Sequence, residues 1–421
     1  MRNIRWLFLL MLAVSGPVAA EPAGNGPLSL QEALRLAYLH HPVMQEAKQD
    51  ILAAHGAWLQ AEALPSPEAE IDIGGLKKHA KDEKQIREGK IDSFSIRQPL
   101  DPIGTRFLRG RMARDDYRVS QGNLDLVWAE IRRDVITIYG TIITAEKAVQ
   151  TAEENLNATR QFFSKVQTRY QSGNALQSDV TRARIEVSRA ENELLITQRD
   201  VKAAKGELNL FIGRSIDDAL ELSDALEYEP LQYQYQDMKA RAFENRVDLK
   251  NETTILSTRK KGFWAALLKT VFPQMSIGVE RTTEDYENDT AILLSASYPL
   301  WGFNLGEIKK AKAEKEKQEI KLEALKKNIG LDVYRAFLDA ELTDKQVALQ
   351  KKALEGANEL LRQVTIQYEE GEMPFLGYLE NIKTIKETRL AYFTALKNYK
   401  EKVADLERAI QATPIPEGVK P

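Results

Sequence analysis

Mostly apolar residues recur along two long stretches of the chain, at spacings that alternate between three and four except for one step, from 131 to 135, and its counterpart. The first seam runs from Leu124 to Tyr170, and a matching seam runs from Leu322 to Tyr368, 198 residues later. Spacings of this kind are typical of a helix that packs along a partner as a coiled coil. Residues 105–170 contain no proline, so they predict one helix of ~100 Å at 1.5 Å per residue, and 305–368 predict another of similar length.

The same order of parts flanks both seams. Each half has a helix of moderate length that ends near Pro65 or Pro273, then two short strands, the long helix, a turn at Gly173 or Gly371 and a returning helix. We interpret this as one internal duplication and not as a solenoid, because the period is so long. The predicted units are a signal peptide (1–20), a first repeat (21–213), a connecting equatorial segment (214–238), a second repeat (239–411) and a tail (412–421).

The four short segments alternate imperfectly between apolar and polar residues, as strands of a membrane barrel do. They cover 68–75, 93–98, 275–280 and 291–298. Between the members of each pair lie polar stretches at 76–90, with six basic and three acidic residues, and at 280–289, with one basic and five acidic residues. We interpret both stretches as solvated hairpin loops in preference to ligand-binding loops.

The first residues indicate export from the cytoplasm. Two arginines within residues 1–5 precede nine apolar residues at 6–14 and the small pair Ala19 and Ala20, which predicts a secretory signal peptide cleaved before Glu21. The alternative, a membrane anchor, needs about 20 apolar residues. With no later apolar stretch of 18 residues, the mature chain could enter a bilayer only as a β-barrel. Four strands cannot close one, whereas three copies would supply twelve around an open lumen.

Composition excludes several classes of chemistry. The 421 residues include no cysteine, which rules out disulfides, thiolate metal sites, thiol nucleophiles and a lipoprotein anchor. A net charge of −3 gives no general attraction to nucleic acid. The four histidines have no spacing typical of paired metal ligands on a helix, and neither a phosphate loop nor a nucleophile elbow is present. We therefore expect no catalytic residues, no cofactor, no metal site and no enzyme activity. The histidines are His40, His41, His55 and His79.

The duplicated order of parts, together with Arg-Tyr-Gln-Ser-Gly-Asn-Ala-Leu-Gln-Ser-Asp-Val at 169–180, closely resembles the TolC family of outer-membrane efflux proteins. The resemblance implies a mainly α fold with a small β part. Long coiled-coil hairpins would form a trimeric α-barrel in the periplasm, and four strands per protomer would form a shared twelve-stranded transmembrane β-barrel. It also implies a passive outer-membrane channel. The absence of cysteine adds that the chain is not a lipoprotein, and the near-neutral charge adds that nucleic acid is not a partner.

The implied partners are two further copies of the chain, outer-membrane lipid, a periplasmic adaptor (membrane fusion) protein and an inner-membrane pump of the RND, ABC or MFS type. Residues at 98–101 and 153–156 favour the CzcC-like metal-efflux branch of the family. The rival interpretation, from another class, is a soluble periplasmic coiled-coil scaffold or adaptor with the strands as a small head.

By position, the family's gating residues correspond to Asp179, Tyr368 and the aperture carboxylate Glu380. The place of a latch arginine holds Met373, and that of a second carboxylate holds Gly377, so the resemblance implies only part of the family's latch. The plainer alternatives are that Asp179 caps the returning helix and that Glu380 lies on a solvated face.

The two hairpin turns are the expected contacts for the adaptor. Exposed apolar side chains in the second turn would project from a polar tip; alternatively, they pack against the neighbouring helix. The candidate docking residues are Gly173, Asn174, Gly371, Met373, Pro374 and Phe375.

Overall fold

A computed structural model of the chain describes residues 26–73, 91–101, 104–284, 287–298, 305–370, 372–412 and 415–416. The predicted signal peptide (1–20), the loop at 76–90 and Gly371 lie outside the described residues, as does most of the predicted tail. The division into units at 213, 238 and 411 stays a prediction.

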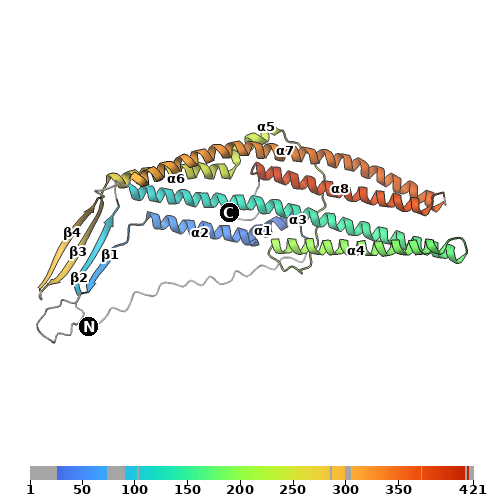
Figure 1. The fold of residues 1–421 in the computed structure, drawn as a ribbon, viewed down its shortest axis with the longest axis horizontal. Helices are drawn as coiled ribbons and strands as arrows, with labels where there is room; N and C mark the ends of the chain where they lie inside the picture. The colour runs from blue at the N-terminus through green and yellow to red at the C-terminus, as the bar shows by residue number, and fades with distance from the viewer. Residues whose placement is uncertain are drawn as a thin grey trace, which may run out of the picture.

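The described elements occur in the same order twice (Figure 1). The first set comprises α1 (Leu30–His40), α2 (Pro42–Glu62), β1 (Glu68–Ile73), β2 (Ile91–Leu100), α3 (Thr105–Gln171) and α4 (Gln177–Phe211). The second comprises α5 (Tyr235–Asn245), α6 (Val247–Val271), β3 (Gln274–Glu284), β4 (Glu287–Ser297), α7 (Leu305–Glu369) and α8 (Phe375–Ala409).

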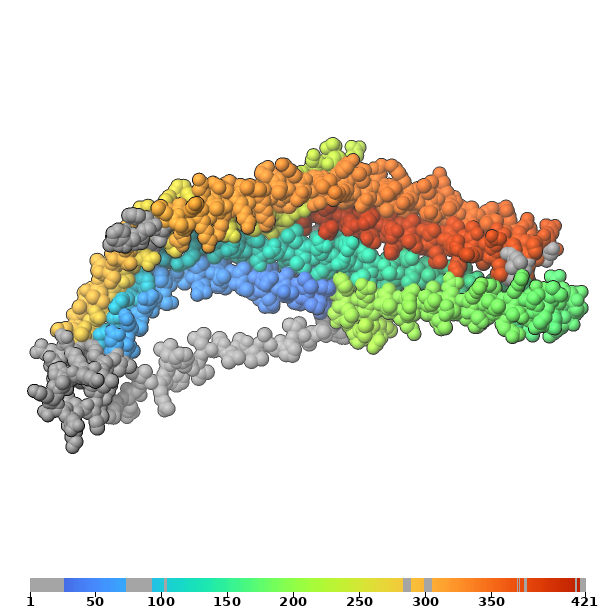
Figure 2. Space-filling view, viewed as in Figure 1, coloured from blue at the N-terminus to red at the C-terminus, as the bar shows by residue number. Residues whose placement is uncertain are grey.

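Both predicted long helices are confirmed. Helix α3 has 67 residues and α7 has 65, so each spans ~100 Å. Near the sheet α3 packs on α2 and α6, and farther away on α4 and α8, while α7 packs on α6 and then α8. Side by side across the molecule, the helices therefore follow one lateral order: α2 or α4 at one edge, then α3, then α6 or α8, and finally α7. The molecule is elongated and gently bowed (Figures 1 and 2).

The sequence predicts one helix of moderate length before each strand pair, and these are α2 and α6. Each is preceded by a short helix, α1 or α5, that the sequence pattern did not predict. The chain breaks between α1 and α2 at His41, where Pro42 starts the new helix and the His41 Nδ1 accepts the Val43 N–H at 3.3 Å. Proline at the first position is compatible with a helix because its missing N–H would be unpaired there in any case. The second break, at Arg246, separates α5 from α6.

The four strands form one antiparallel sheet in the order β1-β2-β3-β4. Its register places Ala69, Ile96, Val279 and Ile292 side by side, and Glu70, Ser95, Glu280 and Ala291 beside one another in the next row. One face is therefore apolar and the other mainly polar, which confirms the predicted alternation. The apolar face is exposed, with Ile292 80% and Leu294 69% accessible.

The interpretation of 280–289 as a loop was wrong. Strand β3 continues to Glu284 and β4 begins at Glu287, with these two residues paired. The backbone ladder of a hairpin forms through N–H and C=O groups that every residue here carries, so acidic side chains do not end it.

The buried core is narrow and follows the predicted seams. Ile329, Val333, Ala340 and Val347 on α7 are fully buried. The widest core lies where α1 and α2 meet α3, and there Trp128 packs edge-on against Tyr38 with ring centroids 5.2 Å apart. Within the described residues, none of the helices combines the length and the apolar content needed to cross a membrane.

Candidate functional site

The turn between α3 and α4 forms the end of the molecule farthest from the sheet (Figure 1). Gly173 has a φ of +76°, the Asn174 N–H donates to the Arg169 carbonyl at 2.8 Å, and the Gly173 N–H donates to the Tyr170 carbonyl at 2.9 Å. This pair of bonds is a Schellman ending, in which glycine takes the left-handed position without strain. The glycine turn at 173 is thus explained by local backbone chemistry.

Asp179 lies in the first turn of α4. Its Oδ2 accepts the N–H of Leu176, the residue before the helix, at 3.2 Å. A carboxylate at this place also interacts favourably with the positive end of the helix dipole. The N-cap residue is Leu176, so Asp179 does not cap the helix from the N-cap position that the sequence predicts; it bonds back to the N-cap backbone from the third helical position.

Tyr368, near the end of α7, is the centre of an aromatic cluster that joins the two hairpins. Its ring stacks on Tyr378 of α8, with centroids 4.5 Å apart, and lies 6.5 Å from Phe162 of α3. The Lys165 Nζ lies 5.5 Å from the same ring, close enough for a cation–π attraction. Burial, and secondarily Tyr378, raise the pKa of Tyr368, while the Arg169 charge opposes that rise.

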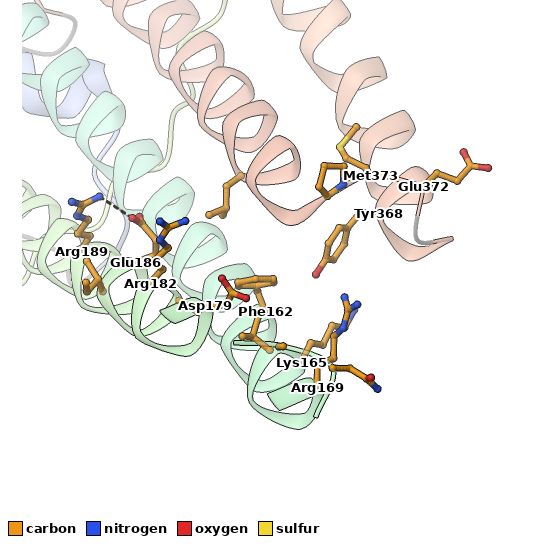
Figure 3. A pocket seen from close by; sticks show the side chains of 17 residues that line it. Phe162, Lys165, Arg169, Asp179, Arg182, Glu186, Arg189, Tyr368, Glu372 and Met373 are labelled. Atoms are coloured by element: carbon orange, nitrogen blue, oxygen red, sulfur yellow. Dashed lines mark hydrogen bonds and ion pairs between the residues drawn. The ribbon is translucent and has the colours of Figure 1, made fainter. Parts of the chain in front are cut away.

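A cleft of about 950 Å³ separates the two hairpins at this end, and both Asp179 and Tyr368 line it. In Figure 3 Tyr368 projects from the second hairpin toward Lys165 and Arg169 of the first, and Asp179 lies beside Phe162. The structure thus brings two of the three predicted gating residues to one cleft. Met373, in the predicted arginine position, lines it as well.

Glu380, the third predicted gating residue, does not line this cleft. It is exposed on α8, and its backbone carbonyl accepts the Thr384 hydroxyl at 3.1 Å. Gly377, which holds the position of the family's second carboxylate, lies beside the Met373 side chain. A Cβ added at Gly377 would lie 3.6 Å from the Met373 Cγ, which is ordinary van der Waals contact.

The predicted docking residues differ in their exposure. Gly173, Asn174 and Pro374 are exposed, whereas Met373 is half-buried and packs against the core between α7 and α8. Gly371 lies outside the described residues, and Phe375 starts α8 with a side chain whose placement is also outside them.

The two tips differ in charge, a feature that the hydropathy pattern does not indicate. At the offset of 198, residues 160–189 hold six basic and two acidic residues, a net +4, and residues 358–387 hold three basic and six acidic residues, a net −3. Basic residues of the first tip that line the cleft include Lys165, Arg169 and Arg182. Counting charges over the matched segments would have revealed this. In the described part of the chain, Lys386–Glu193 is the ion pair between hairpins closest to the tips.

Metal ligation has no structural candidate within the described ranges, which contain no group of three or more histidine, aspartate or glutamate side chains able to hold an ion. His41 instead packs on Phe211 with ring centroids 4.8 Å apart, and burial lowers its pKa. His79 lies outside the described residues.

Solved structures of outer-membrane channels share this fold. The Campylobacter jejuni CmeC outer membrane channel superposes with a TM-score of 0.77 at 12% identity, over 93% of this chain and 87% of that one. The open state of the Neisseria gonorrhoeae MtrE outer membrane channel gives 0.73 at 19% identity, over 91% and 88%. Long duplicated hairpins joined to a four-stranded sheet are thus the fold of a class of outer-membrane channels.

Residues 33–214 and 267–411 match the outer membrane efflux protein family, and the chain belongs to that family. The cobalt-zinc-cadmium resistance protein CzcC of Cupriavidus metallidurans is 23% identical over 395 residues, covering 91% of this chain and 90% of CzcC. The resemblance to TolC-like channels is confirmed, as are the predicted fold class and channel function. Membership in a channel family also agrees with the expectation that the chain is no enzyme, and it disfavours the soluble scaffold.

Proposed function

We propose that the chain is the passive outer-membrane duct of a tripartite efflux system. Three copies would form one tunnel that receives substrate from an inner-membrane pump through a periplasmic adaptor. The observation that carries this proposal is a sheet with one exposed apolar face joined directly to helices of ~100 Å. The sheet suits a bilayer on one face and water on the other, and the helices are long enough for a periplasmic conduit.

The two edges of the protomer support a ring of copies. Along α7 an exposed apolar stripe of five residues lies on one face of the helix. Helix α5 packs on α7 and covers part of this stripe at Tyr334, whose ring centroid lies 5.3 Å from that of Tyr235. The opposite edge, formed by α2 and α4, also exposes large apolar residues. Exposed apolar residues on two different edges favour a head-to-tail arrangement, in which the α7 edge of one copy contacts the opposite edge of the next. Contacts of this kind can close into a ring. The α7 stripe comprises Leu331, Tyr334, Leu338, Leu342 and Leu349; the opposite edge includes Leu52, Leu59, Ile185 and Leu195.

The sheet has the same two edges, since β1 leads from α2 and β4 leads into α7. Pairing β4 of one copy with β1 of the next would satisfy the open backbone groups of both strands. Three copies, the number that the family implies, would then share twelve strands. The Glu70–Arg97 ion pair, at 3.1 Å on the polar face, would lie on the lumen side.

At the other end, the cleft and the two turns would form the aperture and the adaptor contact. Asp179 and Tyr368 line one cleft and so could hold the hairpins together, and Glu380 would contribute negative charge to the mouth. The exposed turn residues Gly173, Asn174 and Pro374 would meet the adaptor. Met373 would act mainly by packing under this surface.

For the cargo we propose divalent metal ions. The support is the 23% identical relative, whose name assigns it to cobalt, zinc and cadmium resistance. Because the chain holds no candidate metal cluster in its described ranges, the ions would pass through without a resident binding site.

Fractionation and conductance test the duct. We expect the mature chain in the outer-membrane fraction, and purified trimers should conduct ions in planar bilayers. Recovery in the soluble periplasm, or trimers without conductance in any lipid, would refute the proposal. Deleting the gene should also raise sensitivity to cobalt, zinc or cadmium salts; unchanged sensitivity to all three would reject the cargo and leave the duct standing.

A further inference from the structure

The ends of the helices next to the sheet carry far more positive charge than the rest of the chain. Residues 104–118, 259–271 and 305–317 together contain fourteen basic and five acidic residues, whereas the whole chain has a net charge of −3. These three segments belong to α3, α6 and α7, which neighbour one another in the lateral order. The excess is therefore local to one level of the molecule.

The three helices have two distinct sides at this level. One side contains two clefts of about 880 and 260 Å³ that share lining residues from α3 and α6. Five acidic and four basic residues line them, without an aromatic residue among them. This side is nearly balanced in charge and its apolar lining residues are small or aliphatic, so it differs from the opposite side in both charge and aromatic content.

The opposite side combines apolar and basic residues. At about 100° per residue, each helix turns one of each kind away from the clefts: Phe107 and Arg111 on α3, Trp264 and Lys260 on α6, and Leu305 and Lys309 on α7. We name these six residues the collar. Phe107 is 59% exposed, Trp264 56% and Leu305 63%, so three large apolar side chains lie in the open.

The collar residues are ordered along the helix axis. On each helix the apolar residue is closer to the sheet, and the basic residue follows one turn farther away, ~6 Å at 1.5 Å per residue. Arg111 lies over the Phe107 ring, 4.0 Å from its centroid. No ion pair links Lys260 or Lys309 to a carboxylate in the part of the chain that the structure describes. Apolar rings followed by cations toward the water match the order of acyl chains and phosphates at a bilayer surface.

We propose that the collar binds anionic phospholipid headgroups in the leaflet that faces the periplasm. The apolar members would enter the boundary of the acyl chains, and Arg111, Lys260 and Lys309 would pair with lipid phosphates. Threefold repetition would place nine such cations around the channel. The inference rests on the proposed function, because it requires the sheet to lie in the bilayer.

Quenching of Trp264 by brominated lipid tests the collar. Trimers of the full mature chain are reconstituted in phosphatidylethanolamine vesicles that contain brominated phosphatidylglycerol or brominated phosphatidylcholine. The signal of Trp264 is the difference between the wild type and Trp264→Phe. We expect several-fold stronger quenching by the anionic lipid at low salt, and loss of this preference at high salt, since salt screens exposed charges.

A matched pair of variants separates the two sides of the helices. Lys260→Gln with Lys309→Gln removes one lysine each from α6 and α7 on the collar side, and should lower the anionic-lipid preference roughly fivefold or more. Lys269→Gln with Lys310→Gln removes one lysine from each of the same helices on the cleft side, and should leave the preference unchanged.

The collar proposal would be overturned if both variant pairs lost the anionic-lipid preference equally. It would also be overturned if the wild type showed neither a preference for anionic lipid nor an effect of salt. Conducting trimers with either result would leave the channel proposal intact. Chains that do not insert into any vesicle would overturn both proposals. The salt series on the wild type decides the matter even where a variant fails to assemble.

Discussion

At the scale of single residues, two glycines with the same backbone conformation have different surroundings. Gly173 and Gly213 have φ values of +76° and +77°. A Cβ at position 173 would meet nothing within 4 Å, whereas one at 213 would lie 2.6 Å from the His40 Cβ. The first turn needs glycine for its backbone alone, and the second needs it for packing as well.

Replacing each glycine by alanine should therefore give different losses of stability. Gly173→Ala should cost about 1 kcal/mol from the left-handed backbone. Gly213→Ala should cost more, about 3 kcal/mol, because α1 must also shift. Thermal unfolding of the detergent-solubilised trimer measures both, and equal shifts in the two variants would contradict the packing argument.

The Asp179 carboxylate can be tested separately for capping and for gating. Asp179→Asn keeps an oxygen for the Leu176 N–H and removes the charge, and Tyr368→Phe keeps the aromatic stack and removes the hydroxyl. If these groups latch the tip, both variants should raise the closed-level conductance in planar bilayers with nearly unchanged unfolding temperature. An unchanged closed level, together with destabilisation of Asp179→Ala by about 1 kcal/mol, would assign Asp179 to the cap alone.

Tyr399 gives a prediction for alkaline solution. Its buried hydroxyl donates to the Glu229 carbonyl at 2.6 Å, and burial, with smaller contributions from Asp344 and Tyr228, raises its pKa to about 12. The folded state then holds this proton more tightly than the unfolded state, whose pKa is about 10. The Tyr399 contribution is complete below pH 10 and is lost as pH rises toward 12, by up to about 1.4 kcal/mol per pH unit. Tyr399→Phe should flatten this decline in urea unfolding measured from pH 9 to 12; an equally steep decline would show that other groups cause it.

At the scale of elements, the exposed α7 stripe should be the contact between copies. Leu342→Glu places a charge in that contact and should shift the trimer toward monomer by about tenfold or more in the association constant. Lys351→Glu, on the far side of the same helix, is the control and should leave the trimer unchanged. Light scattering of the detergent-solubilised protein gives both masses, and an intact trimer in Leu342→Glu would place the contact elsewhere.

The bounds of the helices were predicted more accurately from the sequence than the bounds of the strands. The long helices were predicted within one residue at their ends because a seam such as Val333 to Val347 repeats without interruption and no proline intervenes. Three of the four strands, β2, β3 and β4, were predicted too short, and β3 runs to Glu284. Its outer residues are polar, and ladder pairing does not depend on the side chains that a hydropathy pattern detects.

The candidate site was only partly predictable for a related reason. Asp179 and Tyr368 follow from the family's positions, but their shared cleft depends on how two hairpins far apart in the sequence pack. Lys165 is a solvent-side position, and Phe162 lies beside the predicted seam position Phe163, so nothing in the linear pattern marks either residue. Tyr378 is likewise recognisable only once its ring is seen on Tyr368.

At the scale of the whole molecule, the net charges of +4 and −3 on the two tips imply alternation around a ring of copies. Six hairpins of alternating sign should attract their neighbours, and exposed attraction of this kind weakens with salt. The double variant Lys165→Gln with Arg182→Gln should have a higher closed-level conductance than the wild type at low salt. At high salt, its closed-level conductance should approach that of the wild type. The control is Lys202→Gln with Lys351→Gln, which lies far from the tips. If the closed-level conductance of the wild type changed with salt only in proportion to the bulk conductivity, the proposed attraction between neighbouring tips would be wrong.

The two longest helices have a mechanical consequence for such an assembly. Helices α3 and α7 run from the sheet to the tips without a break, whereas α4 ends at Phe211 and α8 at Ala409, near the middle of the molecule. Because α4 and α8 pack along α3 and α7, a displacement of the tips would bend the longer pair like beams held at the sheet. A beam clamped in the membrane returns when the load is removed, so the closed shape would be restored elastically, without a further source of energy at the tip.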